Sequence, residues 1–363
     1  MTINEAGKFE REDGVTYTAA NAPVIYQNTV DGTAPAPVAD LKAGVRYLKA
    51  NDGLRPGNMN KIVAAGNSPL YDPYLEEIGA VMDSTDDIYC AMPFCTITNL
   101  EYADAAFEWL HASETASGGG FGGMAGDGSS EKTKFTEFEK ALCSSLVETY
   151  KENLTSFGPD PDQFESDLLA LINSSIAYYV ENYVDNVDAF AAENSVLTYE
   201  NGVVTAPIVA AFVEEYMPRS KGVPAFDSLD ASSTECSLFG GKHFSTQTAD
   251  VLKGLSGEFE EAAAAVKDSD ADNTDELLAK VALMSPMTFL TGGNESTVAP
   301  YWRFRNGMTD QDVGSVAAFT ITQILQQKGP AEVDYNLIWN VGHMSADYSY
   351  ADVQSYVDSI CQK

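Results

Sequence analysis

The sequence predicts an α/β fold in which helices flank a mostly parallel sheet and a large, mainly helical segment is inserted. Short β-favouring runs alternate with helical patterns near both ends of the 363-residue chain, which is typical of parallel sheets. Between them the composition shifts to glycine and serine, from Ser117 to Ser130, and then to long amphipathic patterns. We therefore expect a core made of residues 1–112 and 279–363, with a helical lid at residues 113–278.

The first part of the core begins with a helix and two short strands. Apolar residues recur at helical spacing after a proline, so a helix is predicted from Pro37 to Asn51. Its apolar stripe consists of Val38, Leu41, Val45 and Leu48, and its outward side chains are Asp40, Lys42 and Arg46. Strands are predicted at Lys61–Ala65 and Asp87–Met92, followed by a helix from Tyr102 to His111.

The insertion carries two apolar stripes at helical spacing. The first consists of Phe135, Phe138, Leu142 and Leu146, and the second of Phe164, Leu168, Leu171, Ile172, Tyr179 and Tyr183. Such stripes pack in a core more often than they hold a cofactor. The glycine-rich stretch before them has no strand ahead of it and no Gly-Lys-Ser/Thr after it. It is therefore predicted to be a flexible linker rather than a phosphate-binding loop.

The stretch from Ala299 to Tyr348 predicts a strand, an acidic turn, a helix, a second strand and a histidine turn. Asp310 and Asp312 follow the first strand, and the second strand leads directly to His343. Parallel neighbours joined by one helix end at the same edge of a sheet. We therefore expect Asp310 and His343 to be the acid and base of a catalytic triad. In the alternative interpretation, the two aspartates cap the helix and the histidine only ends a strand.

The charge of the chain excludes some partners. With 54 acidic and 21 basic residues, the formal charge of −33 repels nucleic acids and anionic membranes. No run has the length of a membrane span, and Met1–Gly14 lacks the basic start and apolar stretch of a signal peptide. This favours a cytoplasmic location, although a mature secreted protein would have the same composition. The sequence does not predict an oligomeric state.

The five cysteines and three histidines give no metal signature. The cysteines are odd in number and include no Cys-x-x-Cys pair, so we expect mostly free thiols rather than disulfides or a zinc site. The histidines are too few and too scattered for a histidine-based metal centre. Neither a metal nor a cofactor is expected.

Several stretches of the chain resemble bacterial tannases of the smaller, single-chain type. They are DLKAGVRYLKANDGLRPGN from Asp40, GNSPLYDPYLEEIGA from Gly66, CTITNLEYADAAFEW from Cys95, VPAFDSLDASSTECSLFGGKHF from Val223 and APYWRFRNGMTDQD from Ala299. Tannases are tannin acyl hydrolases of the α/β-hydrolase superfamily and are related to feruloyl esterases. The resemblance implies a serine-type carboxylic-ester hydrolase that cleaves galloyl or similar phenolic esters through a Ser-His-Asp triad.

The resemblance also assigns roles to particular positions. Asp310 matches the triad acid and His343 the general base. Lys221, Glu235 and Asp312 match positions that hold the three phenolic hydroxyls of a galloyl group. Carboxylates accept hydrogen bonds from phenols, and an ammonium donates to phenolic oxygens. By residue type alone, the lysine and the glutamate would instead form a solvated surface pair.

His243 lies in the same segment as Glu235. It is a further candidate for lining the substrate pocket.

The nucleophile elbow of the family, Gly-x-Ser-x-Gly, does not occur in this sequence. The family places it directly after the strand predicted here at Lys61–Ala65. Such a turn both presents the serine and supplies an oxyanion-hole N–H. Ser68 is the nearest serine, but Pro69 follows it and has no N–H to donate, so Ser68 is not the expected nucleophile. We therefore predict that this polypeptide is inactive or nearly so.

Three functional hypotheses follow. The first is a phenolic-ester hydrolase whose natural chain has residues absent from this sequence. The second is a non-catalytic relative that binds aromatic acids or a partner, with Asp310 and His343 as remnants. The third is a serine peptidase of the same fold, which has the acid and histidine turns but not the matches at Lys221 and Glu235.

Overall fold

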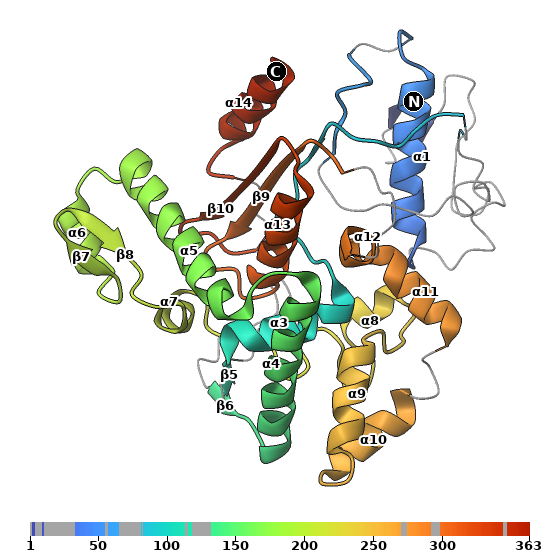
Figure 1. Ribbon diagram of the computed structural model, residues 1–363, viewed down its shortest axis with the longest axis vertical. Coiled ribbons are helices and arrows are strands. Elements are labelled where there is room, and N and C mark those ends of the chain that lie inside the picture. Colours follow the sequence, from blue (N-terminus) through green and yellow to red (C-terminus); the bar gives the residue numbers. More distant parts are fainter. Residues whose placement is uncertain are drawn as a thin grey trace.

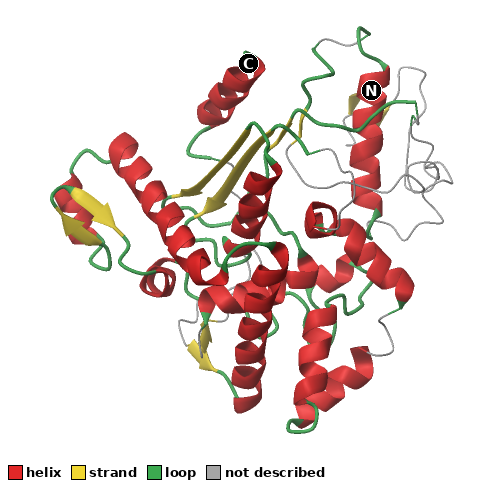
Figure 2. Ribbon diagram, viewed as in Figure 1, coloured by secondary structure: helices red, strands yellow, loops and turns green. Residues whose placement is uncertain are grey.

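The computed structural model describes most of the chain, and helices predominate over strands in it (Figure 2). The described residues are 2–3, 9–10, 33–54, 57–64, 81, 83–112, 115–117, 132–269, 274–291, 298–343 and 347–363.

A four-stranded parallel sheet forms the centre of the core. In spatial order its strands are β10 (Glu332–Ile338), β9 (Tyr301–Gly307), β4 (Cys90–Ala91) and β3 (Val63–Ala64). Every neighbouring pair is parallel, so all four carboxyl ends lie at one edge. The spatial order follows the chain order, and each connection leads to the adjacent strand. This arrangement confirms the predicted α/β class and its mostly parallel sheet.

Helices cover both faces of this sheet (Figure 1). α13 (Val316–Lys328) joins β9 to β10 and packs on one face with Phe304. α14 (Tyr350–Cys361) packs on the other face with Tyr301. Successive side chains of a strand point to opposite faces, which explains how β9 packs against both helices.

The edge strand β10 is covered by α5 (Pro161–Tyr183) of the inserted segment. The backbone N–H of Leu337 donates to Ser175 Oγ at 3.0 Å, so a group that a sheet edge would leave unpaired is satisfied. The insertion therefore packs directly against the core sheet.

The described part of the chain between β4 and β9 forms mainly helices, with two short strand pairs and several irregular stretches. Its described elements are α3 (Leu100–His111), β5 (Thr115–Ser117), β6 (Lys132–Lys134), α4 (Glu137–Phe157), α5, α6 (Val187–Glu193), β7 (Thr198–Glu200), β8 (Val203–Thr205), α7 (Val209–Tyr216), α8 (Thr234–Leu238), α9 (Thr246–Leu255), α10 (Glu260–Ser269), α11 (Asp275–Met284) and α12 (Pro286–Thr291). The domain division at 112/113 and 278/279 stays a prediction, and the second boundary falls inside α11.

The two predicted apolar stripes form the centre of the insertion. Leu142, Leu146 and Leu168 are fully buried, and they share one cluster with residues of α13 and β10. Tyr183 differs, because it is 44 % exposed and stacks on Tyr348 with ring centroids 4.5 Å apart. Of the predicted linker, residues 118–130 lie outside the described ranges.

The first predicted helix is confirmed, but its predicted apolar face is only partly buried, because Val38 is buried while Leu41 and Leu48 are exposed. α1 spans Ala36–Ala50, yet Leu41 is 61 % exposed while Arg46 is only 8 % exposed. Asp86 explains the difference, because its carboxylate lies 2.8 Å from Lys42 Nζ and 3.1 Å from Arg46 Nε. The helix therefore turns its basic side toward the acidic loop before β4.

The remaining described strands, β1 (Thr2–Ile3) and β2 (Phe9–Glu10), form an antiparallel pair. All five cysteines are free thiols, as predicted. Among the described helices, none combines the length and apolar character that crossing a bilayer requires.

Candidate active site

The loops after β9 and β10 are in direct contact at the carboxyl edge of the sheet. Met308 N donates to Ile338 O at 2.8 Å, and Thr309 N donates to Val341 O at 3.0 Å. At Gly307 a Cβ would overlap the carbonyl oxygens of Val341 and Gly342, so only glycine allows this approach. The close contact brings together the two turns that carry Asp310 and His343.

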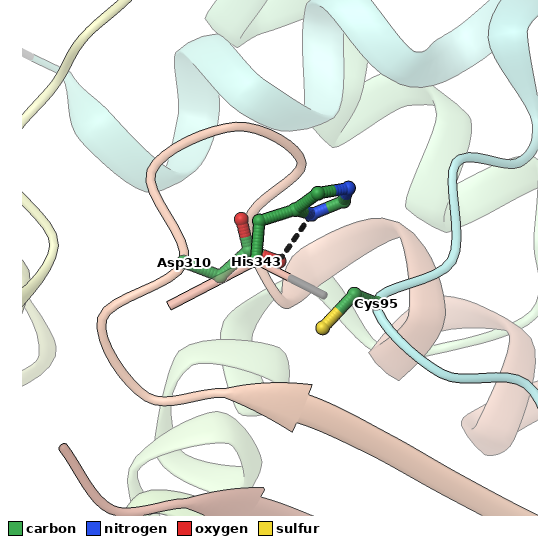
Figure 3. A group of neighbouring side chains, drawn as sticks. All are labelled: Cys95, Asp310 and His343. Carbon is green, nitrogen blue, oxygen red and sulfur yellow. Dashed lines mark hydrogen bonds and ion pairs between the residues drawn. The ribbon is translucent and has the colours of Figure 1, made fainter. Parts of the chain in front are cut away.

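Asp310 and His343 form a hydrogen-bonded pair. His343 Nδ1 lies 3.2 Å from Asp310 Oδ2, and Figure 3 shows the second ring nitrogen pointing away from the carboxylate. Asp310 is fully buried, and its Oδ1 accepts the backbone N–H of Asp312 at 3.0 Å. The hydrogen bond that His343 donates to the Asp310 carboxylate raises the pKa of His343 above its ordinary value, while burial of the ring opposes the rise. This is the geometry that an acid and a base of a triad require.

Lys221, Glu235 and Asp312 lie around this pair. Lys221 Nζ is 3.3 Å from Glu235 Oε1, and both side chains are largely buried rather than solvated. The charge of Asp312 raises the pKa of His343 and the charge of Lys221 lowers it, so both are electrostatically coupled to the ring. Three candidate substrate-binding residues thus converge on one region, although they come from two distant parts of the chain.

A hydrogen bond and a ring contact hold Lys221 in this place. The neighbouring Ser220 donates through Oγ to the carbonyl of Gln311 at 2.8 Å, which ties the lid segment to the acidic turn. Lys221 Nζ also lies 4.1 Å from the centroid of the Phe226 ring. The ammonium is therefore fixed between a ring and a carboxylate.

His243 lies in a second buried pair. Its Nδ1 is 3.1 Å from Asp227 Oδ1, and both residues are less than a tenth exposed. Asp227 also accepts from the backbone N–H of Ser245 at 3.0 Å and contacts Cys236 Sγ at 3.3 Å. Through the contact with Cys236, the His243–Asp227 pair stabilises the segment around α8, the helix that carries Glu235. A role for His243 in lining the pocket stays a prediction.

Ser68 lies outside the described residues, as do all positions from 65 to 80. They follow β3, whose carboxyl end lies at the same edge as the Asp310 and His343 turns. The place of Ser68 relative to the Asp310–His343 pair is therefore not described.

Cys95 is a functional candidate that the sequence analysis did not identify. It follows β4, and its Sγ reaches the Asp310–His343 pair (Figure 3). The signal was the same as for the aspartate and the histidine, namely a reactive side chain directly after a strand of the sheet.

A large cavity lies elsewhere in the insertion. It has a volume of about 480 Å³ between α3, α4, α5 and α7, and its wall includes Trp109, Glu165 and Arg219. None of the predicted site residues lines it.

Comparisons with known proteins point to one group. No protein-family model and no curated protein matches the chain. Among solved structures, the chain is similar to the Fusobacterium nucleatum tannase, with 26 % identity, a TM-score of 0.72, and coverage of 97 % of this chain and 75 % of that one.

Two further solved structures agree with this similarity. The native tannin acyl hydrolase of Lactobacillus plantarum has 26 % identity and a TM-score of 0.71, with 91 % of this chain and 72 % of that one covered. A tannin acyl hydrolase in complex with ethyl gallate has 25 % identity and a TM-score of 0.71, with 99 % and 74 % covered.

Proposed function

The chain is a tannase-like protein of the α/β-hydrolase fold, and on this premise we propose that its site takes galloyl or similar phenolic acyl groups. The grouping of Lys221, Glu235 and Asp312 beside the Asp310–His343 pair carries this proposal. One ammonium and two carboxylates suit the adjacent hydroxyls of a phenolic ring. The ethyl gallate bound to a structural neighbour belongs to the same ligand class.

The acid–base pair suits ester hydrolysis. In a Ser-His-Asp triad, His343 would take the serine proton and later give it to the leaving alcohol, while Asp310 would stabilise the imidazolium. With Nδ1 engaged by the acid, Nε2 is the nitrogen that would take the proton of the nucleophile. The sequence contains no Gly-x-Ser-x-Gly, however. We therefore propose that this polypeptide binds phenolic acyl groups but hydrolyses them several orders of magnitude more slowly than a complete triad would.

Binding is tested by titrating gallate into the purified protein in a calorimeter. Lys221→Ala and Glu235→Gln are each expected to weaken binding about tenfold or more, because a hydrogen bond to a charged group contributes about 1.5–3 kcal/mol. The matched controls are Lys267→Ala and Glu258→Gln, which change exposed residues of the same types. Gallate affinity that is absent, or equal in all four variants, would overturn the phenolic site.

Turnover is tested with methyl gallate. We expect the 363-residue protein to show no hydrolysis above that of its His343→Ala variant. Hydrolysis that this variant abolishes would contradict the predicted inactivity. An intact mass of the natural protein well above 39.0 kDa, with hydrolysis by that longer chain, would favour the enzyme. A mass that fits the sequence, with gallate binding and no turnover, favours the non-catalytic relative.

A serine peptidase of the same fold is the remaining alternative. The Lys221–Glu235 pair favours a phenolic group over a peptide. Comparing hydrolysis of an aminoacyl amide with that of methyl gallate separates the two.

A further inference from the structure

Three neighbouring strands of the sheet each deliver one metal-binding side chain to the same place. Cys95 follows β4, Asp310 follows β9 and His343 follows β10. One ligand atom of each residue lies within 4.8 Å of the ligand atoms of the other two, and Figure 3 shows the three side chains together. A thiol, a carboxylate and an imidazole are the three ligand types that zinc takes in proteins.

The separations are close to those of a zinc site. Ligand atoms about 2.0–2.3 Å from a tetrahedral zinc ion lie about 3.3–3.8 Å apart. Nδ1 of His343 and Oδ2 of Asp310 are already 3.2 Å apart. The thiol sulfur lies within 4.8 Å of both atoms, so it would have to approach each of them by no more than about 1.5 Å.

The backbone around the thiol is held firmly. Cys95 N donates to Arg305 O at 2.8 Å, and the residue has a positive φ of 43°, so its position depends on the strand ends around it. Its Sγ lies 4.0 Å from the carbonyl oxygen of Gly342, next to His343 in the chain. Cys95 is 6 % exposed and Asp310 is fully buried, which shields the cluster from bulk water. These constraints fix the thiol beside the pair.

We propose that Cys95, Asp310 and His343 form a binding site for a thiophilic divalent cation such as Zn²⁺. The ion lies between Nδ1 and the carboxylate, and water completes the four ligands. Cys95 Sγ loses its proton to solvent on binding, and the imidazole carries its proton on Nε2. The ion replaces the Asp310–His343 hydrogen bond, so the bound state has no acid–base pair. Metal binding at this site does not depend on the proposed function.

Short ligand spacings in the sequence do not indicate this site, because its ligands come from three separate strand ends. Zinc signatures in sequences rest on short spacings such as Cys-x-x-Cys. Asp310 lies 215 positions after Cys95 in the chain, and the parallel sheet brings the two together. The three ligands meet because the ends of their strands lie at one edge of the sheet, and not because the residues are close in the sequence.

The proposal is tested with Co²⁺ and Zn²⁺ on the purified full-length chain. Co²⁺ is expected to give a thiolate-to-metal absorption band, and Zn²⁺ to displace it at one ion per chain. Cys95→Ser is expected to abolish the band and to weaken Zn²⁺ binding by at least about tenfold, since even outer-shell changes cost 10–100-fold. His343→Gln, which changes the opposite side of the site, is expected to weaken binding similarly.

Cys236→Ser is the matched control. Cys236 is also buried and also contacts an aspartate, Asp227, which is paired with a histidine, but this group does not meet the same distances. The control is expected to keep both the band and the Zn²⁺ affinity of the parent. An unchanged band in folded Cys95→Ser, its loss in Cys236→Ser, or no metal binding by the parent would overturn the proposal. Far-ultraviolet circular dichroism of each variant establishes that it is folded.

Discussion

Asp310 uses its two carboxylate oxygens for different tasks. Oδ1 accepts backbone N–H groups of the acidic turn, at 3.0 Å from Asp312 N and 3.3 Å from Val313 N. Oδ2 is left for His343 Nδ1, so the turn fixes the carboxylate in the orientation that the histidine needs. The pKa of His343 is raised chiefly because this carboxylate accepts a hydrogen bond from the charged ring.

Asp310→Asn is therefore expected to lower the pKa of His343. Asparagine keeps the shape of the side chain but has no charge to stabilise the imidazolium. A titration of the His343 ring signals by NMR should give a midpoint above 6.5 in the parent and a lower one in the variant. Asp250→Asn, at an exposed position on α9, serves as the control. Equal midpoints in the parent and in Asp310→Asn would show that the charge of Asp310 does not hold the proton.

At the scale of single residues, the contacts that follow from the order of strands and helices were predicted, and the contacts between irregular segments were not. The sequence predicted that Asp310 and His343 would meet, because each follows a strand and one helix joins the strands. It did not predict the partner of His243, because Asp227 comes from an irregular segment of the lid with no periodic pattern. A solvated Lys221–Glu235 pair was the wrong alternative, because packing of the lid on α3 removes that pair from water.

At the scale of elements, the best-predicted parts are those with a repeating pattern. α13, β9 and β10 occur in the predicted order between Ala299 and Tyr348, because their apolar spacing and their Gly and Pro stop signals are local. β3 and β4 are only two residues long, so their own sequence says little about their pairing, in which β4 lies between β3 and β9. The buried face of α1 was mispredicted in part because ion pairs with Asp86 outweigh the exposure of Leu41.

α3 is the element that joins the sheet to the lid. Glu108 on this helix accepts two hydrogen bonds from the Arg219 guanidinium, each at 2.5 Å, and both side chains are almost completely buried. Arg219 also donates to the carbonyl oxygens of Lys221 and Gly222, each at 2.6 Å. The ion pair thus fixes the segment that carries Lys221.

Arg219→Met is expected to lower the free energy of unfolding by about 3–5 kcal/mol, because it leaves the carboxylate of Glu108 buried and unpaired. Glu108→Met combined with Arg219→Met removes the unpaired charge and should recover part of that loss. Urea unfolding followed by fluorescence measures both. A double variant less stable than Arg219→Met alone would contradict this account. Gallate binding should weaken in both, since the backbone at Lys221 loses its support.

At the scale of the whole molecule, the chain combines a formal charge of −33 with buried carboxylates under the lid. Glu101 on α3 accepts the backbone N–H groups of Thr246 at 3.0 Å and Gln247 at 3.2 Å, at the start of α9. Asp104, one turn on, accepts the N–H of Phe226 at 2.7 Å. Burial raises the pKa of Glu101 to about 7, and burial with the charge of Asp227 raises that of Asp104 to about 7. The docking of the lid on α3 therefore includes two proton-binding groups.

These groups predict that the protein becomes more stable as the pH falls from 8 to 5. A carboxyl whose pKa is raised on folding binds its proton more tightly in the folded state. Its contribution is complete below the unfolded values of 4.5 for Glu101 and 3.8 for Asp104, and is lost as the pH rises through about 7. The raised pKa of His343 acts in the same direction, and so does the falling net negative charge. Burial lowers the pKa of His111 to about 3, which acts in the opposite direction below pH 6.5 and offsets part of this gain.

The test is urea unfolding at pH 5, 6, 7 and 8 on the parent, Glu101→Gln and Asp104→Asn. In the parent, the free energy of unfolding should be greater at pH 5 than at pH 8 by on the order of 2 kcal/mol. Each variant has one titrating group fewer, so its dependence on pH should be shallower. Glu152→Gln, which changes an exposed carboxyl on α4, should keep the slope of the parent. Parallel curves for all four proteins would show that these two buried carboxyls keep their ordinary pKa values, and that lid docking is insensitive to pH.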